Sequence, residues 1–304
     1  MDKSIVVVGS VAFDSIETVH GKTEQTLGGS AVYFSLASSA FTNVKLVGVA
    51  GEDFGAENIA KLRAHKIDLE GLEIIKKGKT FHWHGSYDKD YNEALTKKTE
   101  LNVFETFDPQ LPLSYRNTPN IFLANIDPDL QMRVLDQIKK PRLIACDTMN
   151  FWITGKKKAL LKLLKRVHIL FINEMEARML TGEHNLIKAG HMVLQMGPEV
   201  VIVKRGASGA TLFTGKERIT LPALPVEDVV DPTGAGDSFG GGFMGYISTV
   251  KNWRSLNEIK KAMAYGTVIS SFNVENFSVS SIYRLKKSAI EKRFKKYTAS
   301  LKIC

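Results

Sequence analysis

The stretch Asp231-Pro232-Thr233-Gly234-Ala235-Gly236-Asp237 decides how this chain is interpreted. It follows an apolar segment, Leu221 to Val230, and opens a predicted helix whose apolar residues, from Phe239 to Ile247, recur at the spacing of one buried face. The Gly-Ala-Gly run has almost no side chain, so an anion can approach its backbone N–H groups. The N-terminus of the helix adds positive dipole character at the same point.

Asp237 stands in the first turn of this helix and places a carboxylate beside a pocket for negative charge. A phosphate pocket with a base at its edge is the layout expected for phosphoryl transfer to a hydroxyl group. The alternative is a glycine-rich turn that caps a core helix, with Asp237 as an ordinary helix-start acid. Short glycine patterns recur by chance, so the rest of the chain has to decide.

Composition is typical of a soluble globular enzyme, with 44% hydrophobic and 24% charged residues among 304. The apolar runs are too short to cross a bilayer, and residues 1–10 lead directly into a strand pattern without a signal region. Cys146 and Cys304 cannot build a disulfide framework. We therefore expect a cytoplasmic protein with no membrane partner.

The chain carries a net charge of +9, and much of the excess lies near its C-terminus. These basic residues recur at helical spacing, with Ile290 and Phe294 on the opposite side. That pattern favours a solvated helix face over a nucleic-acid site. We expect no nucleic-acid partner, and the basic charge would help to attract ATP.

Short apolar strands alternate with helical patterns along most of the chain, which predicts a parallel sheet covered on both faces. The predicted strands are 4–9, 44–50, 120–126, 142–147, 167–173 and 199–204, and the predicted helices are 30–41, 56–65, 129–139, 156–166, 174–181 and 185–196. Residues 11–27 and 72–107 break this rhythm and predict a small sheet that covers the site.

Five groups of residues appear in the order found in the ribokinase-like (PfkB) carbohydrate and nucleoside kinases, which the whole chain resembles. They are Gly9 with Asp14, Gly28-Gly29, Asn173-Glu174-Met175-Glu176, Gly206-Ala207-Ser208-Gly209, and Asp231 to Asp237. The resemblance implies a single domain, 1–304, with a three-layer α/β/α core, a mainly parallel central sheet and a small β-sheet lid.

The resemblance also implies the catalytic roles. Asp237 would be the general base, and the N–H groups of Gly234, Ala235 and Gly236 would stabilise charge on the migrating phosphoryl group. Asn173 and Glu176 would lie near the metal and triphosphate, with Glu176 acting on Mg²⁺ through water. A capping box at the start of a helix explains the same pair.

Nucleotide binding is expected at several residues further along the chain. Gly206 and Gly209 follow a strand end and would let the nucleotide lie against bare backbone. Lys204 could meet a phosphate oxygen or simply end its strand in water. Thr233 and Asn273 complete the nucleotide set that the resemblance implies. Asp231 would contribute to a K⁺ site, although an ordinary loop explains that region equally well.

Substrate-side residues are expected at or just beyond predicted strand ends, where ligands of open α/β sheets bind. Carboxylates and amides there suit hydroxyl groups. The set is Asp14, Gly28, Gly29, Asn125 and Asp127, with a polar lid cluster of Tyr87, Asp88, Asp90 and Asn92 that an exposed hairpin turn would also explain.

Two features depart from the family's sugar kinases. Tyr33 stands near the place where those kinases carry a sugar-binding Asn, and Asp147-Thr148-Met149-Asn150 is shifted from the usual Asp-x-Asn. Both leave room for a nucleoside, whose ring could stack on Tyr33, although core packing explains this aromatic as well. His82 and His84 flank Trp83 without a third metal ligand at convincing spacing.

The leading hypothesis is an ATP-dependent, Mg²⁺-requiring kinase that phosphorylates a hydroxymethyl group of a sugar or polyol. The alternatives are a nucleoside kinase of the same fold and a nucleotide-binding regulator without turnover. A nicotinamide dehydrogenase is disfavoured because Gly9 is not followed by further spaced glycines. Open sheet edges on the lid indicate a homodimer.

Overall fold

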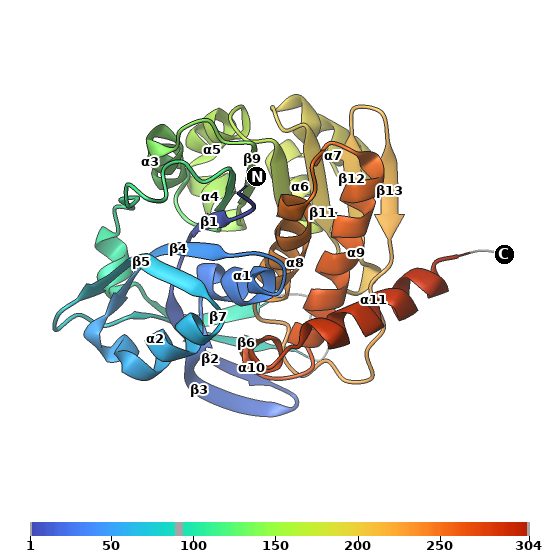
Figure 1. Cartoon of the computed structure of the whole chain (residues 1–304). Helices are drawn as coiled ribbons and strands as arrows, with labels where there is room; N and C mark the ends of the chain where they lie inside the picture. Colours follow the sequence, from blue (N-terminus) through green and yellow to red (C-terminus); the bar gives the residue numbers. More distant parts are fainter. Residues whose placement is uncertain (1, 89–93, 303–304) are drawn as a thin grey trace.

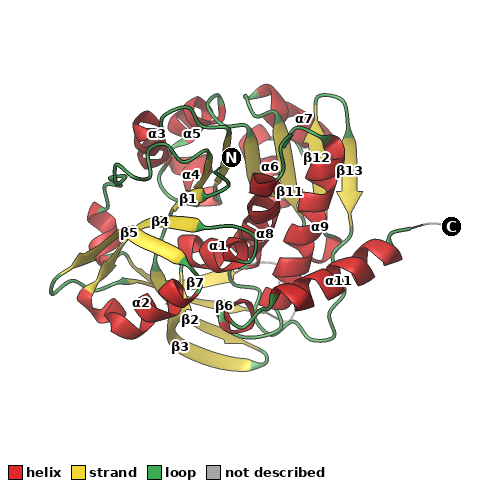
Figure 2. Ribbon diagram, in the orientation of Figure 1, coloured by secondary structure: helices red, strands yellow, loops and turns green. Residues whose placement is uncertain are grey.

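The computed structural model describes residues 2–88 and 94–302, which form two sheets of nine and four strands. Helices cover the larger sheet, and the smaller sheet lies at one end of it, below β1 and α1 in the view of Figures 1 and 2. This arrangement confirms the predicted three-layer α/β/α class with its additional small β-sheet.

The central sheet has the order β13-β12-β11-β10-β9-β8-β1-β4-β5. The strands from β5 to β11 in this order are parallel, β12 is antiparallel to β11, and β13 is antiparallel to β12. Their bounds are β1 Ile5–Val8, β4 Val44–Gly51, β5 Ile67–Ile75, β8 Asn120–Leu123, β9 Leu143–Asp147, β10 Ile169–Asn173, β11 Val200–Lys204, β12 Ala210–Thr214 and β13 Arg218–Leu221.

The apolar strands are buried on both faces, as β1 shows. Ile5 and Val7 join one hydrophobic cluster, while Val6 and Val8 join the other, because successive strand side chains point to opposite faces. The first cluster is covered by α1 Ser30–Ser39, α2 Gly55–Ala64, α8 Ala235–Thr249, α9 Leu256–Asn273, α10 Ser280–Tyr283 and α11 Lys287–Ser300. The second is covered by α3 Pro128–Gln137, α4 Asn150–Gly155, α5 Lys157–Leu164, α6 Glu174–Thr181 and α7 Leu186–Gln195.

The small sheet, which we call the lid sheet, has the order β3-β2-β6-β7. Its strands are β2 Ala12–Thr18, β3 Gly21–Gly28, β6 Phe81–Tyr87 and β7 Ala94–Glu100. β2 and β6 are parallel at its centre, and each has an antiparallel outer neighbour. The segment predicted for the lid is too long at both ends, because residues 72–75 belong to β5 and residues 102–106 form a 3-10 turn.

The predicted strands and helices of the alternating part all occur, with ends that shift by a few residues. The pattern misses the strands β5, β12 and β13 and the helices α4, α9 and α10. β5 and β13 are outer strands whose polar residues stay partly exposed, so neither gives the continuous apolar signal of a buried parallel strand.

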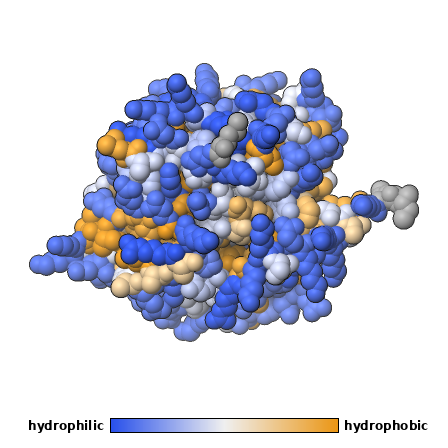
Figure 3. All heavy atoms as spheres, viewed as in Figure 1, coloured by the Kyte–Doolittle hydropathy of each residue, from blue (hydrophilic) through white to orange (hydrophobic). Residues whose placement is uncertain are grey.

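The surface is mainly hydrophilic on the face shown in Figure 3, with apolar residues gathered over the region of β5. None of the helices in the described part of the chain combines the length and apolarity required to cross a bilayer.

Candidate functional site

The order in which strands are added to the central sheet reverses between the neighbouring parallel strands β1 and β8. From β1 the strand order runs to β4 and β5 on one side, and from β8 to β9, β10 and β11 on the other. Ligands of open α/β sheets bind outside the carboxyl ends of strands at such a switch point. The residues after β1 and β8 and those ending β9, β10 and β11 therefore share one edge with the start of α8.

Gly234 sets the geometry at the N-terminus of α8. It is the N-cap, with a φ of 71°, and a Cβ there would lie 2.3–2.4 Å from ring atoms of Tyr33. Glycine satisfies both constraints, since it tolerates positive φ and leaves room for the ring. Tyr33 is 1% exposed and thus packs beneath this turn. This placement matches core packing, the alternative to stacking on a nucleoside ring.

Asp237 lies in the first turn of α8 and remains partly exposed. Burial raises the pKa of its carboxyl to about 7, with the charge of Asp147 acting in the same direction and Lys204 opposing it. A carboxylate of this kind can accept a proton near neutral pH. Asp237 keeps partial contact with solvent at the helix start, which a general base requires.

Lys204 ends β11 and joins the carboxylates of the site. Its Nζ lies 2.6 Å from Oδ2 of Asp147, and the two side chains are 19% and 4% exposed. A Cβ on Gly236 would lie 3.1 Å from the same Nζ, so the ammonium group sits against the start of α8. Burial lowers the pKa of Lys204, but Asp147, Glu176 and Asp237 raise it more strongly. The lysine does not simply end its strand in water.

Asn173 and Glu176 form a capping box at the start of α6. The Asn173 Oδ1 accepts from the Glu176 N–H at 2.7 Å, and Glu176 Oε2 accepts from the Asn173 N–H at 2.8 Å. Burial raises the pKa of Glu176 to about 7, Lys204 opposes that effect and Asp147 adds to it. The cap uses one carboxylate oxygen, and the group still faces the charges of the site.

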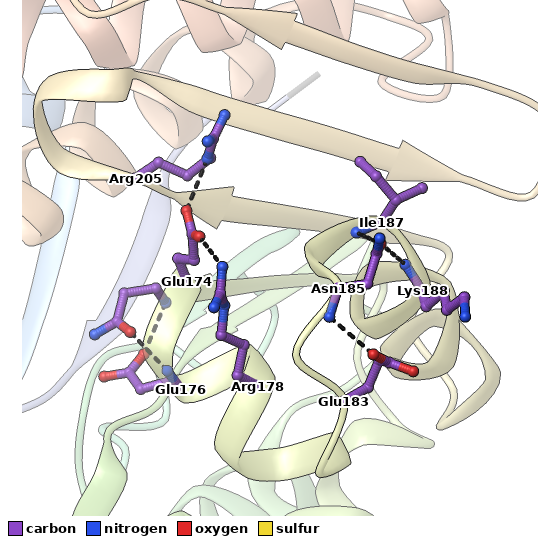
Figure 4. Close-up of polar contacts among 9 residues, drawn as sticks. Glu174, Glu176, Arg178, Glu183, Asn185, Ile187, Lys188 and Arg205 are labelled. Atoms are coloured by element: carbon purple, nitrogen blue, oxygen red, sulfur yellow. Dashed lines mark hydrogen bonds and ion pairs between the residues drawn. The ribbon is translucent and has the colours of Figure 1, made fainter.

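A second ion-pair group lies beside this capping box. Glu174 accepts from Arg205 Nε at 2.8 Å and from Arg178 at 2.5 Å, as Figure 4 shows. Arg205 follows Lys204 directly. The ion pairs of Glu174 therefore connect the turn after β11 to the start of α6.

Gly206 and Gly209 bracket the turn after β11 and differ in their surroundings. Both have positive φ, 51° and 86°. A Cβ on Gly206 would meet open space, whereas one on Gly209 would lie 2.1 Å from the Leu221 carbonyl oxygen. Gly206 therefore keeps the accessibility expected of a nucleotide contact, and Gly209 closes the turn against its neighbour.

Asp14 faces the site from β2. It is 4% exposed, and burial raises its pKa to about 7, with Asp231 and Asp237 adding and the Tyr33 hydroxyl opposing. A Cβ on Gly28 would lie 2.0 Å from Asp14 Oδ2, so the carboxylate rests directly on this glycine. Gly29 caps α1 with a φ of 96°. The predicted group Asp14, Gly28 and Gly29 is thus contiguous.

Asp231 and Asn273 are buried and hold the loop before α8. Asp231 accepts from the Thr233 and Ser278 N–H groups, both at 2.8 Å, and has no exposed surface. Asn273 is equally buried and donates to the Thr233 carbonyl at 2.7 Å. Asn273 therefore holds the loop before α8 in place. The sequence predicted a nucleotide contact at this residue, but its side chain has no exposed surface.

Asn125 and Asp127 are occupied elsewhere. Asn125 Oδ1 accepts from Trp152 Nε1 at 2.9 Å. Asp127 caps α3 through the Asp129 N–H at 2.9 Å and pairs with Lys156 Nζ at 2.6 Å. Each Asp127 oxygen has a local partner, so the structure describes a helix cap where the sequence predicted a substrate ligand.

The lid sheet contributes two aromatic residues to the face that bears Asp14. Thr233 Oγ1 lies 3.3 Å from the Tyr87 hydroxyl, which links β6 to the loop before α8. Trp83 pairs in register with Asp14 across the parallel strands β6 and β2, so both side chains share one face. Asp90 and Asn92 of the predicted lid cluster lie outside the described residues.

Asp147 and Trp83 were not assigned to the site from the sequence. Asp147 ends a predicted parallel strand next to the one ending at Asn173, and this position was the available signal. Trp83 alternates with two histidines, and only the pairing of β6 with β2 shows which face it takes.

The arrangement suits a polyphosphate and a divalent cation. The α8 amides and the Lys204 ammonium favour negative charge, and the capping box uses only one of the two Glu176 carboxylate oxygens, which are ligands of the kind that Mg²⁺ prefers. Both oxygens of Asp147 have protein partners, the Thr148 N–H and Lys204 Nζ. Asp237 and Asp14 lie close enough for their charges to interact.

Known proteins resemble this chain over nearly its whole length. The model of the pfkB family carbohydrate kinases matches residues 2–284. A cytidine kinase of Thermococcus kodakarensis is 31% identical over 250 residues, or 79% of this chain and 87% of the relative. A nucleoside kinase of Methanocaldococcus jannaschii is 26% identical over 293 residues, covering 90% of this chain and 91% of the relative.

Solved structures show the same fold. The crystal structure of the Methanocaldococcus jannaschii nucleoside kinase superposes with a TM-score of 0.77 at 21% identity, over 97% of this chain and 98% of that one. Arabidopsis thaliana ribokinase, complexed with ribose and ATP, gives a TM-score of 0.77 at 22% identity, over 97% and 99%. The ribokinase-like architecture is thereby confirmed.

Proposed function

The chain belongs to the PfkB family of carbohydrate kinases, phosphotransferases that use a hydroxyl group as acceptor, and we propose that its acceptor is the hydroxymethyl group of a nucleoside. The observation that carries the proposal is the face of the lid sheet on which Trp83 lies in register with Asp14. This face offers a carboxylate for sugar hydroxyls and an aromatic ring for a base.

Asp14 is the anchor for the sugar. A buried carboxylate that rests on Gly28 can accept hydrogen bonds from two neighbouring hydroxyl groups. Its charge interacts with that of Asp237, so the sugar anchor and the base belong to one site.

Asp237 accepts the proton of the attacking hydroxyl group. Phosphoryl-transfer transition states are mostly loose, so the proton leaves late and the position of the base matters more than its strength. The amides of Gly234, Ala235 and Gly236 stabilise the charge on the transferred group, and Lys204 lies against the same helix start.

ATP is the phosphoryl donor in this proposal, with Gly206, Lys204 and Thr233 on its side of the site. Mg²⁺ would be held near Glu176 and would neutralise phosphate charge when bound. The raised pKa of Glu176 fits this role, because a buried carboxylate gains most from a nearby cation.

Free sugars and polyols are the second candidate substrates. The Asp14–Gly28–Gly29 group recognises hydroxyl groups whether or not a base is attached, and the matching family model is that of carbohydrate kinases. A nucleotide-binding regulator would not need Asp237, so retention of this carboxylate favours an enzyme.

ADP release over a panel of nucleosides, free sugars and sugar phosphates tests the proposal. We expect kcat/KM to be highest for a nucleoside, and highest activity on a free sugar would contradict this substrate class. Asp237→Asn should retain ATP binding and lower kcat by roughly 10² to 10⁴. Near-normal turnover of this variant would exclude Asp237 as the base.

We also propose that the chain acts as a single domain in the cytoplasm, that K⁺ binds near Asp231, and that two copies pair through the lid sheet. Activity with K⁺ replaced by Na⁺ tests the cation. Light scattering distinguishes the chain mass of 33.7 kDa from twice that value.

A further inference from the structure

A cluster of two histidines and a glutamate lies on the lid sheet, on the face opposite the proposed substrate face. His82 and His84 alternate along β6, so both side chains point to the same side, and Glu100 pairs with His82 across β6 and β7. Asp14 and Trp83 occupy the other face of these strands. The cluster is therefore separate from the phosphoryl-transfer site.

We propose that His82, His84 and Glu100 form a binding site for a first-row divalent transition metal, of which Zn²⁺ is the best match. One ligand atom from each residue lies within 4.8 Å of the others. His84 Nε2 and Glu100 Oε2 are 3.1 Å apart, and the two imidazole rings have centroids 3.9 Å apart. Within residues 2–88 and 94–302 no other group of this kind has such spacing.

The donor set selects the metal. Two imidazoles with one carboxylate suit Zn²⁺ and its neighbours, whereas Mg²⁺ prefers oxygen ligands. The Mg²⁺ of the reaction would therefore compete poorly with Zn²⁺ for the histidine cluster, and Zn²⁺ would bind there in preference to the carboxylates around Lys204. Three protein ligands leave a fourth position for water.

Neighbouring side chains hold the cluster in place. The Ser15 hydroxyl lies 2.8 Å from His82 Nε2, a contact that restrains the ring plane and leaves Nδ1 as the other ring nitrogen for a metal. Lys98 Nζ lies 3.0 Å from the other Glu100 oxygen, Oε1.

The site is open to an ion from solvent. The His84 and Glu100 side chains are 30% and 36% exposed, while His82 lies deeper at 9%. A metal bound here would join β6 to β7, and β6 carries Tyr87 and Trp83 on its other face. The ion would thus stiffen the strand that forms the lid side of the substrate site.

Untagged, chelator-treated protein should be titrated with Zn²⁺ by calorimetry in the presence of millimolar Mg²⁺, which occupies oxygen sites. We expect one Zn²⁺ per chain, and a visible absorption band of tetrahedral type when Co²⁺ replaces it. His84→Ala and Glu100→Gln should each weaken binding by more than 10-fold and remove the band. Ser15→Ala should weaken it by about 10- to 100-fold.

His184→Ala, at an exposed histidine outside the cluster, is the matched control and should bind Zn²⁺ as the wild type does. Because His84 and Glu100 are partly exposed, their variants should fold, and circular dichroism checks this. Absence of stoichiometric Zn²⁺ binding, or binding that His84→Ala and Glu100→Gln leave unchanged, would overturn the proposal.

Discussion

Lys204 is the residue on which the charge balance of the site depends. Its ammonium group pairs with a carboxylate that is only 4% exposed, and its charge also reaches Glu176 and Asp237. A buried pair contributes little relative to an apolar one, but removal of a single partner leaves an uncompensated charge. The loss of stability on removal of Lys204 should therefore arise mainly from the buried Asp147 carboxylate that is left unpaired.

Replacement of this lysine alone and together with its partner tests that account. Lys204→Met should lower the free energy of unfolding by about 3 to 5 kcal/mol. Addition of Asp147→Asn should recover more than half of the loss, while activity stays low in both variants. Urea denaturation of the single and double variants measures the coupling, and simple additivity of the two changes would contradict the pairing.

Asp237 makes both activity and stability depend on pH. Its folded pKa of about 7 lies above the ordinary Asp value of 3.8, so the stability it contributes is complete below the lower value and is lost as pH rises through the higher one. The Asn side chain of Asp237→Asn does not ionise, so the variant avoids the cost of a buried charge. Its stability relative to the wild type should therefore increase as pH rises.

The expected gain in Tm for Asp237→Asn is about 2 °C or more at pH 8, since 1 kcal/mol shifts Tm by roughly 2 to 4 °C in chains of this size class. The gain should shrink towards pH 5. Wild-type kcat should fall as pH decreases through 7, because the base becomes protonated. Calorimetry and initial rates over this pH range provide the measurements, and a gain independent of pH would refute the buried-charge explanation.

At the level of elements, the start of α6 combines a structural and a chemical role. Asn173 and Glu176 satisfy each other's backbone N–H groups, which stabilises the helix end. The same carboxylate faces Lys204 and Asp147. The two interpretations of the motif are thus compatible, and different substitutions separate them.

Asn173→Ala removes the cap and should cost about 1 kcal/mol of stability. Glu176→Gln keeps a capping side chain at the same position and should leave stability unchanged or higher. It should instead raise the Mg²⁺ concentration needed for half-maximal activity several-fold. Thermal unfolding and Mg²⁺ titration of the rate compare the variants, and equal Mg²⁺ dependence would limit Glu176 to the cap.

For the whole molecule, Asp231 and Ser278 connect the helical layer, the loop before α8 and the lid sheet. Asp231 accepts from the Ser278 N–H, and the Ser278 hydroxyl donates to the Leu27 carbonyl at 2.6 Å. Thr18 of β2 also donates to the Val230 carbonyl at 2.9 Å. These hydrogen bonds fix the positions of the base, the anion-binding amides and the sugar anchor relative to one another, and we call this set of contacts the frame.

Asp231→Ala should therefore damage the whole molecule rather than one contact. It leaves two buried N–H groups without acceptors, at about 1 to 3 kcal/mol each. Ser278→Ala keeps the backbone donor and should cost less, about 1 kcal/mol. Chemical denaturation ranks the two variants, and the reverse order would show that the hydroxyl, not the carboxylate, holds the frame.

Continuous apolar segments and special backbone positions were predictable from the sequence. Buried parallel strands and the helix after Gly234 leave local signals, and so does the capping box. The roles of Asn125, Asp127 and Asn273 were not predictable, because their neighbours Trp152, Lys156 and Ser238 are set by how helices pack. A polar side chain at a strand end looks the same whether it faces a ligand or a helix.

The sequence by itself determined the alternating α/β order, the anion-binding turn at 234–236 and the carboxylate of Asp237, because each depends on residues close together in the chain. Only the tertiary structure decided that Lys204 meets Asp147, that Trp83 shares a face with Asp14, and that Glu100 joins His82 and His84. These pairs depend on strand order and register, and the cross-strand register that sets which side chains meet is fixed only when the sheets assemble.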